Sequence, residues 1–244
     1  TINASYIHSA IGLRYLYANL NELQSQSTIV EFTSHLRPAD IVEKILLYKP
    51  KIIGFGVYIW NTEYTTQIIS LLKIIAPDIT IIIGGPEVSY EYEQQEIFQL
   101  CDHLIPGAAD TAFARLCAEL LAHKKNNKIY SITEPALNKL KLPYQYYTDE
   151  DIKNRVLYVE ASRGCPFKCE FCLSALDKTS MPFDIDVFLW EIDRLYQRGA
   201  RNFKFVDRTF NLKVTSSLKI LKFFLERMDE TLFLHFEIIP DRLP

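Results

Sequence analysis

Short, nearly continuous apolar runs separate amphipathic stretches in the first half of the chain. Residues 51–58 (KIIGFGVY) and 79–85 (ITIIIGG) are runs of this kind, typical of strands buried on both faces of a parallel sheet. Leucines and isoleucines recur at helical spacing between such runs. The alternation predicts an α/β fold over residues 1–123, a doubly wound parallel sheet built from strand–helix repeats. The other expected strands lie near 1–3, 28–32 and 102–106, and the expected helices near 9–21, from 38 onward, and near 63–75, 91–100 and 110–123.

The pattern changes after residue 123. Residues 124–154 hold a lysine run, prolines and tyrosines without sustained periodicity, which predicts a linker between two domains. Residues 155–244 return to apolar strands alternating with amphipathic helices, and they predict the first part of a parallel β/α barrel. The expected strands are 155–160, 202–206 and 231–239; one helix is capped by Asp184 or Asp186, and another spans 215–228 with Leu218, Leu221, Phe224, Leu225 and Met228 facing inward.

Composition and charge narrow the class of protein. Apolar residues make up 48% of the chain and charged residues 23%, as in ordinary globular proteins. A net charge of −3 argues against a general binder of phosphate backbones, although a nucleic-acid substrate held by a local patch stays open. No apolar run has the length of a membrane span, and no signal pattern opens the chain, so we expect a cytoplasmic protein. The chain starts at Thr1 without a methionine and ends just after an apolar segment, so we expect both ends to be incomplete.

Three of the five cysteines lie within eight residues, spaced C-x3-C-x2-C, at Cys165, Cys169 and Cys172. Cys101 and Cys117 lie far upstream and apart, so the distribution is not that of a disulfide framework. Three thiolates on one loop can ligate three irons of a 4Fe–4S cluster and leave the fourth iron open to a substrate. A zinc site or a set of structural thiols is the alternative; zinc usually needs four ligands, and no further cysteine or histidine follows nearby.

The loop 163–172 (RGCPFKCEFC) resembles the cluster motif of radical S-adenosylmethionine (SAM) enzymes, in which an aromatic residue, here Phe171, precedes the last cysteine. The resemblance implies that Cys165, Cys169 and Cys172 hold a 4Fe–4S cluster. In that family the open iron chelates the amino and carboxylate groups of SAM, and one electron cleaves SAM to a 5′-deoxyadenosyl radical. An external electron donor such as flavodoxin or ferredoxin is implied as a partner.

The same resemblance points to polar residues at the ends of later barrel strands. Asp207 and Arg208 follow the second strand, where family members carry groups near the amino end of SAM. The usual G-G-E triplet is absent, so the assignment is by position: Asp207 to the ammonium of SAM, and Arg208 to its carboxylate or to cobalamin amides. Glu237, late in the third strand, is a further SAM-binding candidate. A buried structural Asp–Arg pair is the alternative.

Residues 1–123 resemble the cobalamin-binding domain in the order of their features. A first loop and helix reach Gly12, a helix starts at Pro38, a turn at 56–58 follows the third strand, and a glycine pair follows the fourth. Ligands of doubly wound sheets bind at the carboxyl ends of the strands, where this glycine pair lies. The resemblance implies the following cobalamin-binding residues: Tyr58, Trp60, Gly84, Gly85, Glu87, Val88, Ser89 and Gly107.

The sequence departs from the best known form of that domain, which has D-x-H-x-x-G in the first loop, with a histidine that binds cobalt from below. Ile7 and Ser9 take the positions of the Asp and the His, and His8 is one residue out of register. Gly56 and Tyr58 stand where that form has S-x-L. Loss of the lower histidine is common in the cobalamin-dependent branch of radical SAM enzymes, which the departures therefore fit. As alternatives, His8 is a loop histidine, the aromatics are core residues and the glycines only form a turn.

Taken together, the residues predict a cobalamin-dependent radical SAM enzyme that transfers a methyl group to an unreactive carbon. Other members of the family use cobalamin for ring contraction or cyclisation. Two further hypotheses stay open. One is a radical SAM enzyme whose first domain recognises a substrate or partner instead of cobalamin, and the other is a non-enzymatic cofactor-binding or sensing module. No residue in the chain identifies the substrate.

Overall fold

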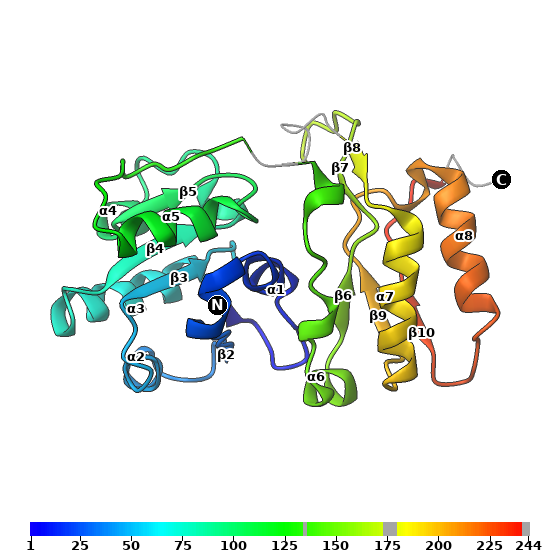
Figure 1. Cartoon of the computed structure of the whole chain (residues 1–244), viewed down its shortest axis with the longest axis horizontal. Coiled ribbons are helices and arrows are strands. Elements are labelled where there is room, and N and C mark those ends of the chain that lie inside the picture. Colours follow the sequence, from blue (N-terminus) through cyan, green and yellow to red (C-terminus); the bar gives the residue numbers. More distant parts are fainter. Residues whose placement is uncertain (134–135, 173–179, 241–244) are drawn as a thin grey trace. The chain divides into compact units, whose positions relative to one another are not determined.

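The computed structural model describes residues 1–133, 136–172 and 180–240, and the chain divides into two compact units, Thr1–Pro135 and Ala136–Pro244 (Figure 1). The division falls inside the predicted linker of residues 124–154. Part of that segment folds with the second unit, where it forms helix α6 (Asp149–Asn154) and two short 3-10 turns, η3 (Leu137–Lys139) and η4 (Tyr144–Tyr146). Each unit is described separately below.

All strands of the first unit are parallel. Strands β1 (Ile2–Asn3) and β2 (Phe32–Thr33) form one pair, and β3 (Ile52–Gly56), β4 (Thr80–Gly84) and β5 (His103–Ile105) form a sheet in the order β3-β4-β5. In the β3–β4 register Gly56 lies opposite Gly84, and Gly84 in turn lies opposite Ile105 in β5. The three strands therefore end together, and their following loops share one edge of the sheet.

Side chains at the carboxyl ends connect the two-stranded and three-stranded sheets. The Thr1 hydroxyl donates to the Gly56 carbonyl at 3.1 Å. The Asn61 amide donates to the carbonyls of Ile2 at 2.9 Å and Gly56 at 3.2 Å. These bonds hold β1 next to β3.

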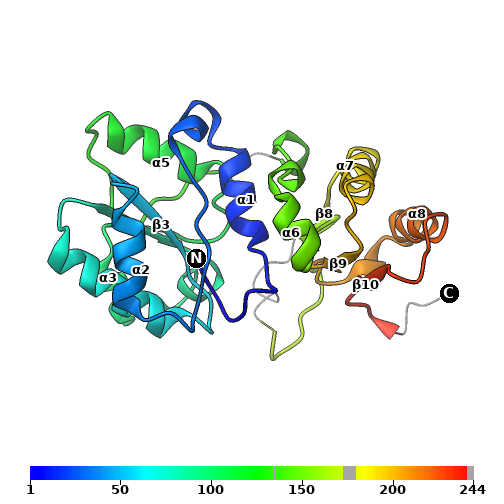
Figure 2. The same ribbon diagram turned by 90° about the horizontal axis from the view of Figure 1, so that it is seen from below.

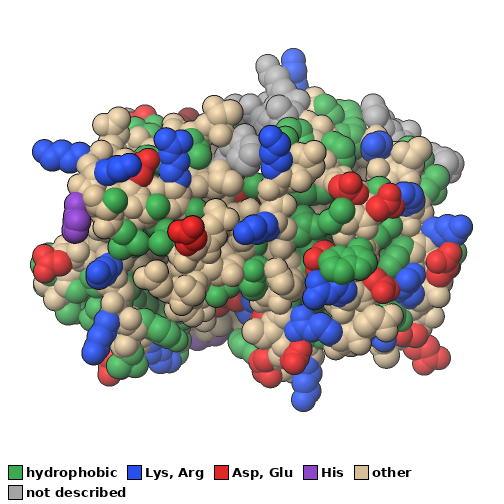
Figure 3. Space-filling view, viewed as in Figure 1, with side chains coloured by type: hydrophobic (Ala, Val, Ile, Leu, Met, Phe, Trp, Pro, Cys, Tyr) green, Lys and Arg blue, Asp and Glu red, His purple; other side chains and the backbone are tan. Residues whose placement is uncertain are grey.

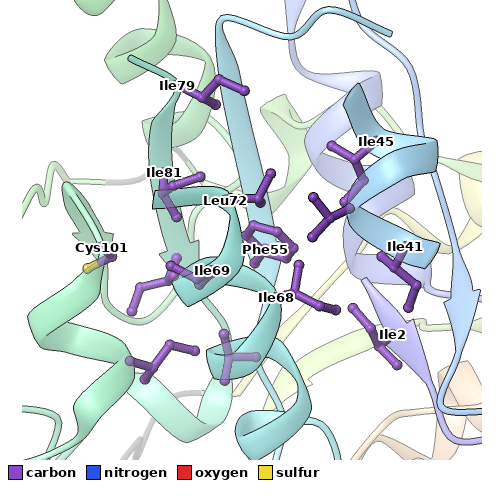
Figure 4. Close-up of a cluster of buried hydrophobic side chains, with 14 of the residues drawn as sticks. Ile2, Ile41, Ile45, Phe55, Ile68, Ile69, Leu72, Ile79, Ile81 and Cys101 are labelled. Carbon is purple, nitrogen blue, oxygen red and sulfur yellow. The ribbon is translucent and has the colours of Figure 1, made fainter. Parts of the chain in front are cut away.

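Helices cover both faces of the first unit's sheet, as Figure 2 shows for α5 and α2 on opposite sides of β3. Alternate residues of β4 point to opposite cores: Ile81, labelled in Figure 4, and Ile83 pack with α2, α3 and α4, whereas Ile82 packs with α5 on the other side. Burying one such side chain contributes about 1.5–3 kcal/mol. The predicted doubly wound α/β class is confirmed. The helices are α1 (Ile11–Ala18), α2 (Pro38–Leu46), α3 (Thr62–Ile75), α4 (Glu96–Leu100) and α5 (Ala112–Leu121), and the 3-10 helices are η1 (Asn21–Gln26) and η2 (Pro86–Val88).

Two helices of the first unit differ from their predictions. The helix expected over 91–100 begins only at Glu96, and Glu91 has a positive φ of 49°, a left-handed conformation that a helix does not continue through. Helix α1 covers only residues 11–18 of the predicted 9–21; its buried residues include Arg14 and Tyr15, and Leu13 lines a cavity.

That cavity, of about 570 Å³, lies between residues 28–32 and residues 51–55. Its walls are mostly apolar and come from α1, β3 and α5, with Leu13, Leu16 and Phe113 among the lining residues. The backbone nitrogen of Thr1, also at its wall, donates to the Val30 carbonyl at 3.1 Å.

The second unit contains three parallel strands in the order β10-β9-β6, namely β6 (Leu157–Val159), β9 (Asn202–Phe205) and β10 (Phe233–His235). Helices α7 (Ile185–Gln197) and α8 (Val214–Leu225) lie next to each other beside this sheet (Figure 2). The Asp184 carboxylate caps α7 by accepting from the backbone N–H groups of Asp186 and Val187. A short antiparallel pair, β7 (Ser162–Gly164) and β8 (Ser180–Pro182), follows β6, and η6 (Phe210–Leu212) follows β9.

Tyrosines of the predicted linker belong to the core of the second unit. Tyr144 and Tyr147 are almost fully buried. The Tyr144 hydroxyl donates to the Glu160 carbonyl at 3.0 Å and accepts from the Glu160 N–H at 3.1 Å, and the Tyr147 hydroxyl donates to the Tyr158 carbonyl at 2.6 Å. The segment 136–154 therefore packs along β6 and does not run as a free connection.

The buried face of α8 is not the predicted one. Phe224 is buried as expected, but Leu218, Leu221, Leu225 and Met228 are exposed. The aromatic rings decide the orientation, because Phe224 packs on Phe203 and Phe205 of β9. The other buried residues of the helix are Ser217, Ile220 and Phe223.

Charged side chains of both signs are interspersed on the face shown in Figure 3, among the residues that the structure describes. Among the helices of residues 1–133, 136–172 and 180–240, none has the length and apolar character that crossing a membrane requires.

Candidate cofactor sites

The turn after β4 approaches the backbone of the neighbouring loop closely. Gly85 has a φ of 115°, and a Cβ on this residue would lie 2.4 Å from the Val57 carbonyl oxygen, so only glycine fits here. The Val57 N–H donates to the Gly84 carbonyl at 2.7 Å, and the Glu87 N–H donates back to the Val57 carbonyl at 3.4 Å. The loops after β3 and β4 thus form one surface, on which backbone is accessible to a flat ligand.

Ser89 connects this turn to the loop after β5. Its hydroxyl donates to the Gly85 carbonyl at 2.8 Å and accepts from the Gly107 N–H at 2.9 Å. Val88 is 0% exposed, so its backbone as well as its side chain is covered beneath the turn. Glu87 is half-buried and lines a groove of about 1020 Å³ with Ile59 and Arg37. The structure therefore brings together the predicted residues of all three loops.

Two aromatic rings lie in the loop after β3. Tyr58 and Trp60 stack with their centroids 4.6 Å apart and their planes 12° from parallel, and Trp60 is 57% exposed. Burial raises the pKa of the half-buried Tyr58. Trp60 is not a core residue. The stacked pair presents an apolar surface near the Gly85 turn, since Val57, which directly precedes Tyr58, is hydrogen-bonded to Gly84 and Glu87 on either side of that turn.

Asn61, which sequence analysis did not single out, fixes this aromatic loop. Its carbonyl oxygen accepts from the Tyr58 N–H at 2.8 Å, while its amide nitrogen donates to the carbonyls of Ile2 and Gly56. The available signal was an asparagine directly before a helix, a position that such residues favour.

The first loop, residues 4–10, is held by a buried ion pair. Glu31 accepts from the Ala10 N–H at 2.7 Å and from the Asn3 amide at 3.0 Å, and it pairs with Arg14 at 2.9 Å. Ile7 and Ser9 stand where the best known cobalamin-binding domains have the Asp and the His of their first loop. The Ile7 side chain is exposed, and Ser9 is buried. Glu31 and Arg14 were also missed from the sequence, because each looks like an ordinary surface charge.

The cysteine loop begins directly after β7. Cys165 is buried, and its sulfur lies 3.6 Å from the Thr209 hydroxyl. Cys169 is exposed, Cys172 is half-buried, and the Cys172 N–H donates to the Cys169 carbonyl at 3.0 Å. Phe171 is 95% exposed. In residues 1–133, 136–172 and 180–240, no three metal-ligating side chains gather at a common point.

The donor chemistry of this loop nevertheless fits an iron–sulfur cluster. All three of its cysteines lie on a single short segment, as a cluster with one open iron requires. The two other cysteines do not fit, since burial raises the pKa of Cys101 to about 11 and of Cys117 to about 12. The thiolate forms of these two are therefore disfavoured at neutral pH.

Asp207 is almost fully buried at the carboxyl end of β9. Its carboxylate accepts from the Ala161 N–H at 3.0 Å and from the Ser162 hydroxyl at 2.6 Å. Burial raises the pKa of Asp207 to about 6, although these hydrogen bonds oppose the change. Arg208 is exposed, and among the described residues the two side chains form no ion pair. The structural Asp–Arg pair considered from the sequence is not present there.

The ends of β9 and β10 meet near the other SAM-binding candidate. Glu237 is exposed, and its carbonyl accepts from the Phe210 N–H at 2.8 Å. Asn211, a further residue that sequence analysis missed, donates to the Ile239 carbonyl at 2.8 Å and accepts from the Ile239 N–H at 2.9 Å. In the same unit, Arg163 donates twice to one Glu160 oxygen, at 2.9 Å and 2.7 Å, just before the cysteine loop.

Comparisons with known proteins first define the class of the first unit and then show which proteins the whole chain resembles. Residues 1–117 match the B12 binding domain family, so the first unit is a B12-binding domain. A radical SAM methyltransferase, TsrM from Kitasatospora setae, has the same fold, with a TM-score of 0.66 and 14% identity over 96% of this chain and 53% of that one. The chain therefore resembles cobalamin-binding radical SAM enzymes, as its sequence indicated, and the match to the B12 binding domain family covers residues 1–117.

The individual relatives are longer proteins. An uncharacterised methyltransferase of Pyrococcus horikoshii is 26% identical over 86% of this chain and 51% of its own length. A 2-(S-pantetheinyl)-carbapenam-3-carboxylate methyltransferase of Streptantibioticus cattleyicolor is 23% identical over 67% of this chain and 28% of its own length. TsrM has been solved with cobalamin and a [4Fe-4S] cluster, and also with tryptophan substrate and a SAM analogue. The chain thus spans about half or less of each relative.

Proposed function

We propose that the protein is a cobalamin-dependent radical SAM enzyme that transfers a methyl group to an unreactive carbon. One observation carries the proposal: a B12-binding domain and a loop of three free thiols occur in the same chain. The methyltransferase names of the relatives favour methyl transfer over rearrangement. When bound, a 4Fe–4S cluster supplies the electron that cleaves SAM to a 5′-deoxyadenosyl radical, and cobalamin supplies a carrier for the methyl group.

In this proposal the second unit binds the cluster and SAM. Cys165, Cys169 and Cys172 ligate the three irons, and the exposed Phe171 lies beside SAM. The Arg208 guanidinium is exposed and can bind the SAM carboxylate, while Asp207 and Glu237 are the candidates for its ammonium. Asp207 already accepts two hydrogen bonds from its own unit, so a bond to SAM adds to these.

The first unit binds cobalamin at the edge where β3, β4 and β5 end. The Gly84-Gly85 turn and the loop after β3, which approach each other closely, give the corrin a continuous backbone surface, and the stacked Tyr58 and Trp60 give it an apolar one. The other proposed contacts are the side chain of Glu87, and Ser89 with Gly107, while the buried Val88 supports the turn. The loop that carries a lower histidine in the best known domain here has Ile7 and Ser9, so the corrin is held without that ligand.

An external one-electron donor such as flavodoxin or ferredoxin completes the proposed system. The loop thiols must stay reduced to bind iron, and oxidising compartments would pair them, so we place the protein in the cytoplasm.

Anaerobic reconstitution tests the cluster. After incubation with iron and sulfide, the wild-type chain is expected to bind iron and, with SAM and dithionite, to release 5′-deoxyadenosine. The variant Cys169→Ala should lose both, because a thiolate ligand is gone. Cys117→Ala is the matched control and should keep its iron. A wild-type chain that binds no iron, or a C169A variant with unchanged iron, contradicts the proposal.

Retention of hydroxocobalamin in gel filtration tests the first unit. Corrin absorbance is expected to elute with the wild-type protein and to decrease in Trp60→Ala. Trp190→Ala is the matched control, since Trp190 is 59% exposed and lies in the second unit. If the wild-type protein elutes without corrin, a radical SAM enzyme that does not use cobalamin becomes the better hypothesis.

A further inference from the structure

The carboxyl end of β9 contacts the cysteine loop through a second residue, Thr209. This threonine is 5% exposed, and its hydroxyl lies 3.6 Å from the Cys165 sulfur, which is also buried. Sulfur is large and polarisable, so a hydrogen bond to it is longer than one between oxygen and nitrogen. The contact joins residues 44 positions apart in the chain.

Thr209 is held firmly in place. Its carbonyl accepts from the Leu212 N–H at 3.2 Å at the start of η6. The next residue, Phe210, is buried and packs its ring on Phe205 at 5.4 Å and on Phe236 at 4.1 Å. The Thr209 hydroxyl therefore has a fixed position before any ligand binds, which is what a preorganised hydrogen bond requires.

Asp207 holds the other end of the segment 161–165, which leads to Cys165. Its carboxylate binds the Ala161 N–H and the Ser162 hydroxyl, directly where β7 begins, and β7 leads to Cys165. The residues from 161 to 165 are thus attached to the end of β9 at both ends. The end of β9 and the pairing of β7 with β8 together hold these residues in place.

Protonation decides the direction of the hydrogen bond. In the free thiol, either sulfur or oxygen can donate. A cysteine that ligates iron is a thiolate and has no proton, so it can only accept. Thr209 must then be the donor. A hydrogen bond to a ligating sulfur withdraws electron density from the cluster and makes its reduction easier.

We propose that Thr209 is a positioning residue that donates a hydrogen bond to the Cys165 thiolate and raises the reduction potential of the cluster, while Asp207 fixes the segment that presents Cys165. This inference rests on the proposed function, because it needs a cluster on the loop. It assigns to the end of β9 a role toward the cluster that is separate from SAM binding.

The test compares Thr209→Val, which keeps the shape and removes the hydroxyl, with Thr209→Ser, which keeps the hydroxyl. Both are reconstituted in the full chain, iron and sulfide are measured, and the cluster is titrated by EPR against a series of reductants. T209V is expected to bind iron and to show a lower midpoint potential. A tenfold change in the reduction equilibrium, about 59 mV for one electron, is the scale of the shift. T209S should stay near the wild-type value.

Thr215→Val is the matched control, because Thr215 is exposed at the start of α8 and should change nothing. Loss of iron from T209V but not from T209S also supports the inference. An unchanged potential in T209V, or equal effects in T209V and T209S, overturns it while leaving the proposed function intact. A wild-type chain that assembles no cluster overturns the proposed function, and this inference with it.

Discussion

Arg14 and Glu31 form a buried ion pair in the first unit, with Nη2 and Oε2 2.9 Å apart and side chains 4% and 10% exposed. Glu31 also binds the Ala10 N–H and the Asn3 amide, so the pair fixes residues 4–10 from two sides. In the best known cobalamin-binding domains a histidine lies in this loop. Here an ion pair holds the loop without one.

Glu31→Gln tests this role. Glutamine can still accept from Ala10 and Asn3, but the Arg14 charge loses its buried partner, which costs about 3–5 kcal/mol in such pairs. Denaturant unfolding should show this loss, and Arg14→Gln/Glu31→Gln, which removes both charges and keeps the acceptor at 31, should be less destabilised than E31Q. Asp40→Asn is the control, because the Arg37–Asp40 pair is exposed and contributes little. Equal effects of E31Q and D40N contradict the argument.

Gly85→Ala should harm both stability and cobalamin retention. A φ of 115° and a Cβ 2.4 Å from the Val57 carbonyl oxygen force the backbone to move, and strain of this kind costs about 1–3 kcal/mol before the clash is counted. Gly199→Ala is matched, because Gly199 also has a positive φ, of 99°, but nothing lies within 4 Å of its Cβ, and it lies in the second unit. Thermal unfolding and hydroxocobalamin retention measure the difference. G85A and G199A variants with the same properties would show that close approach at Gly85 is unimportant.

The titration of Asp207 makes the free energy of unfolding of the second unit depend on pH. Its folded pKa of about 6 lies above the ordinary 3.8, so between these values the folded state binds more protons than the unfolded state. The free energy of unfolding should therefore fall as pH rises from about 4 to about 6, by roughly 2–3 kcal/mol. Asp207→Asn removes this contribution, so its stability relative to wild type should increase across the same range. Parallel profiles of the two proteins from pH 4 to pH 7 would contradict the assignment.

The features that could be predicted from the sequence depend on the pattern of neighbouring residues. The buried strands, the Gly84-Gly85 turn and the cap at Asp184 follow from apolar runs and from the conformations that single residues favour. The B12-binding family was predicted from the order of such features. Their signals lie within a few residues of each other in the chain.

The features that escaped prediction depend on partners distant in sequence. Asn61 binds the carbonyl of Ile2, 59 positions away, and Asp207 binds the backbone of Ala161, 46 positions away. The orientation of α8 is decided by Phe203 and Phe205, not by its own leucines. The residue pattern of one segment does not indicate which distant residue it will contact in the folded protein.

The burial of Cys101 and Cys117 makes these two cysteines less reactive than the exposed cysteine of the loop. With pKa values of about 11 and about 12, these two stay protonated and react slowly with oxidants and alkylating agents. Cys169 is exposed and Cys172 half-buried, so oxidation by air affects the cysteines of the loop first. A brief alkylation at neutral pH therefore reports the state of the loop alone, and it can distinguish intact from oxidised preparations before any iron is added.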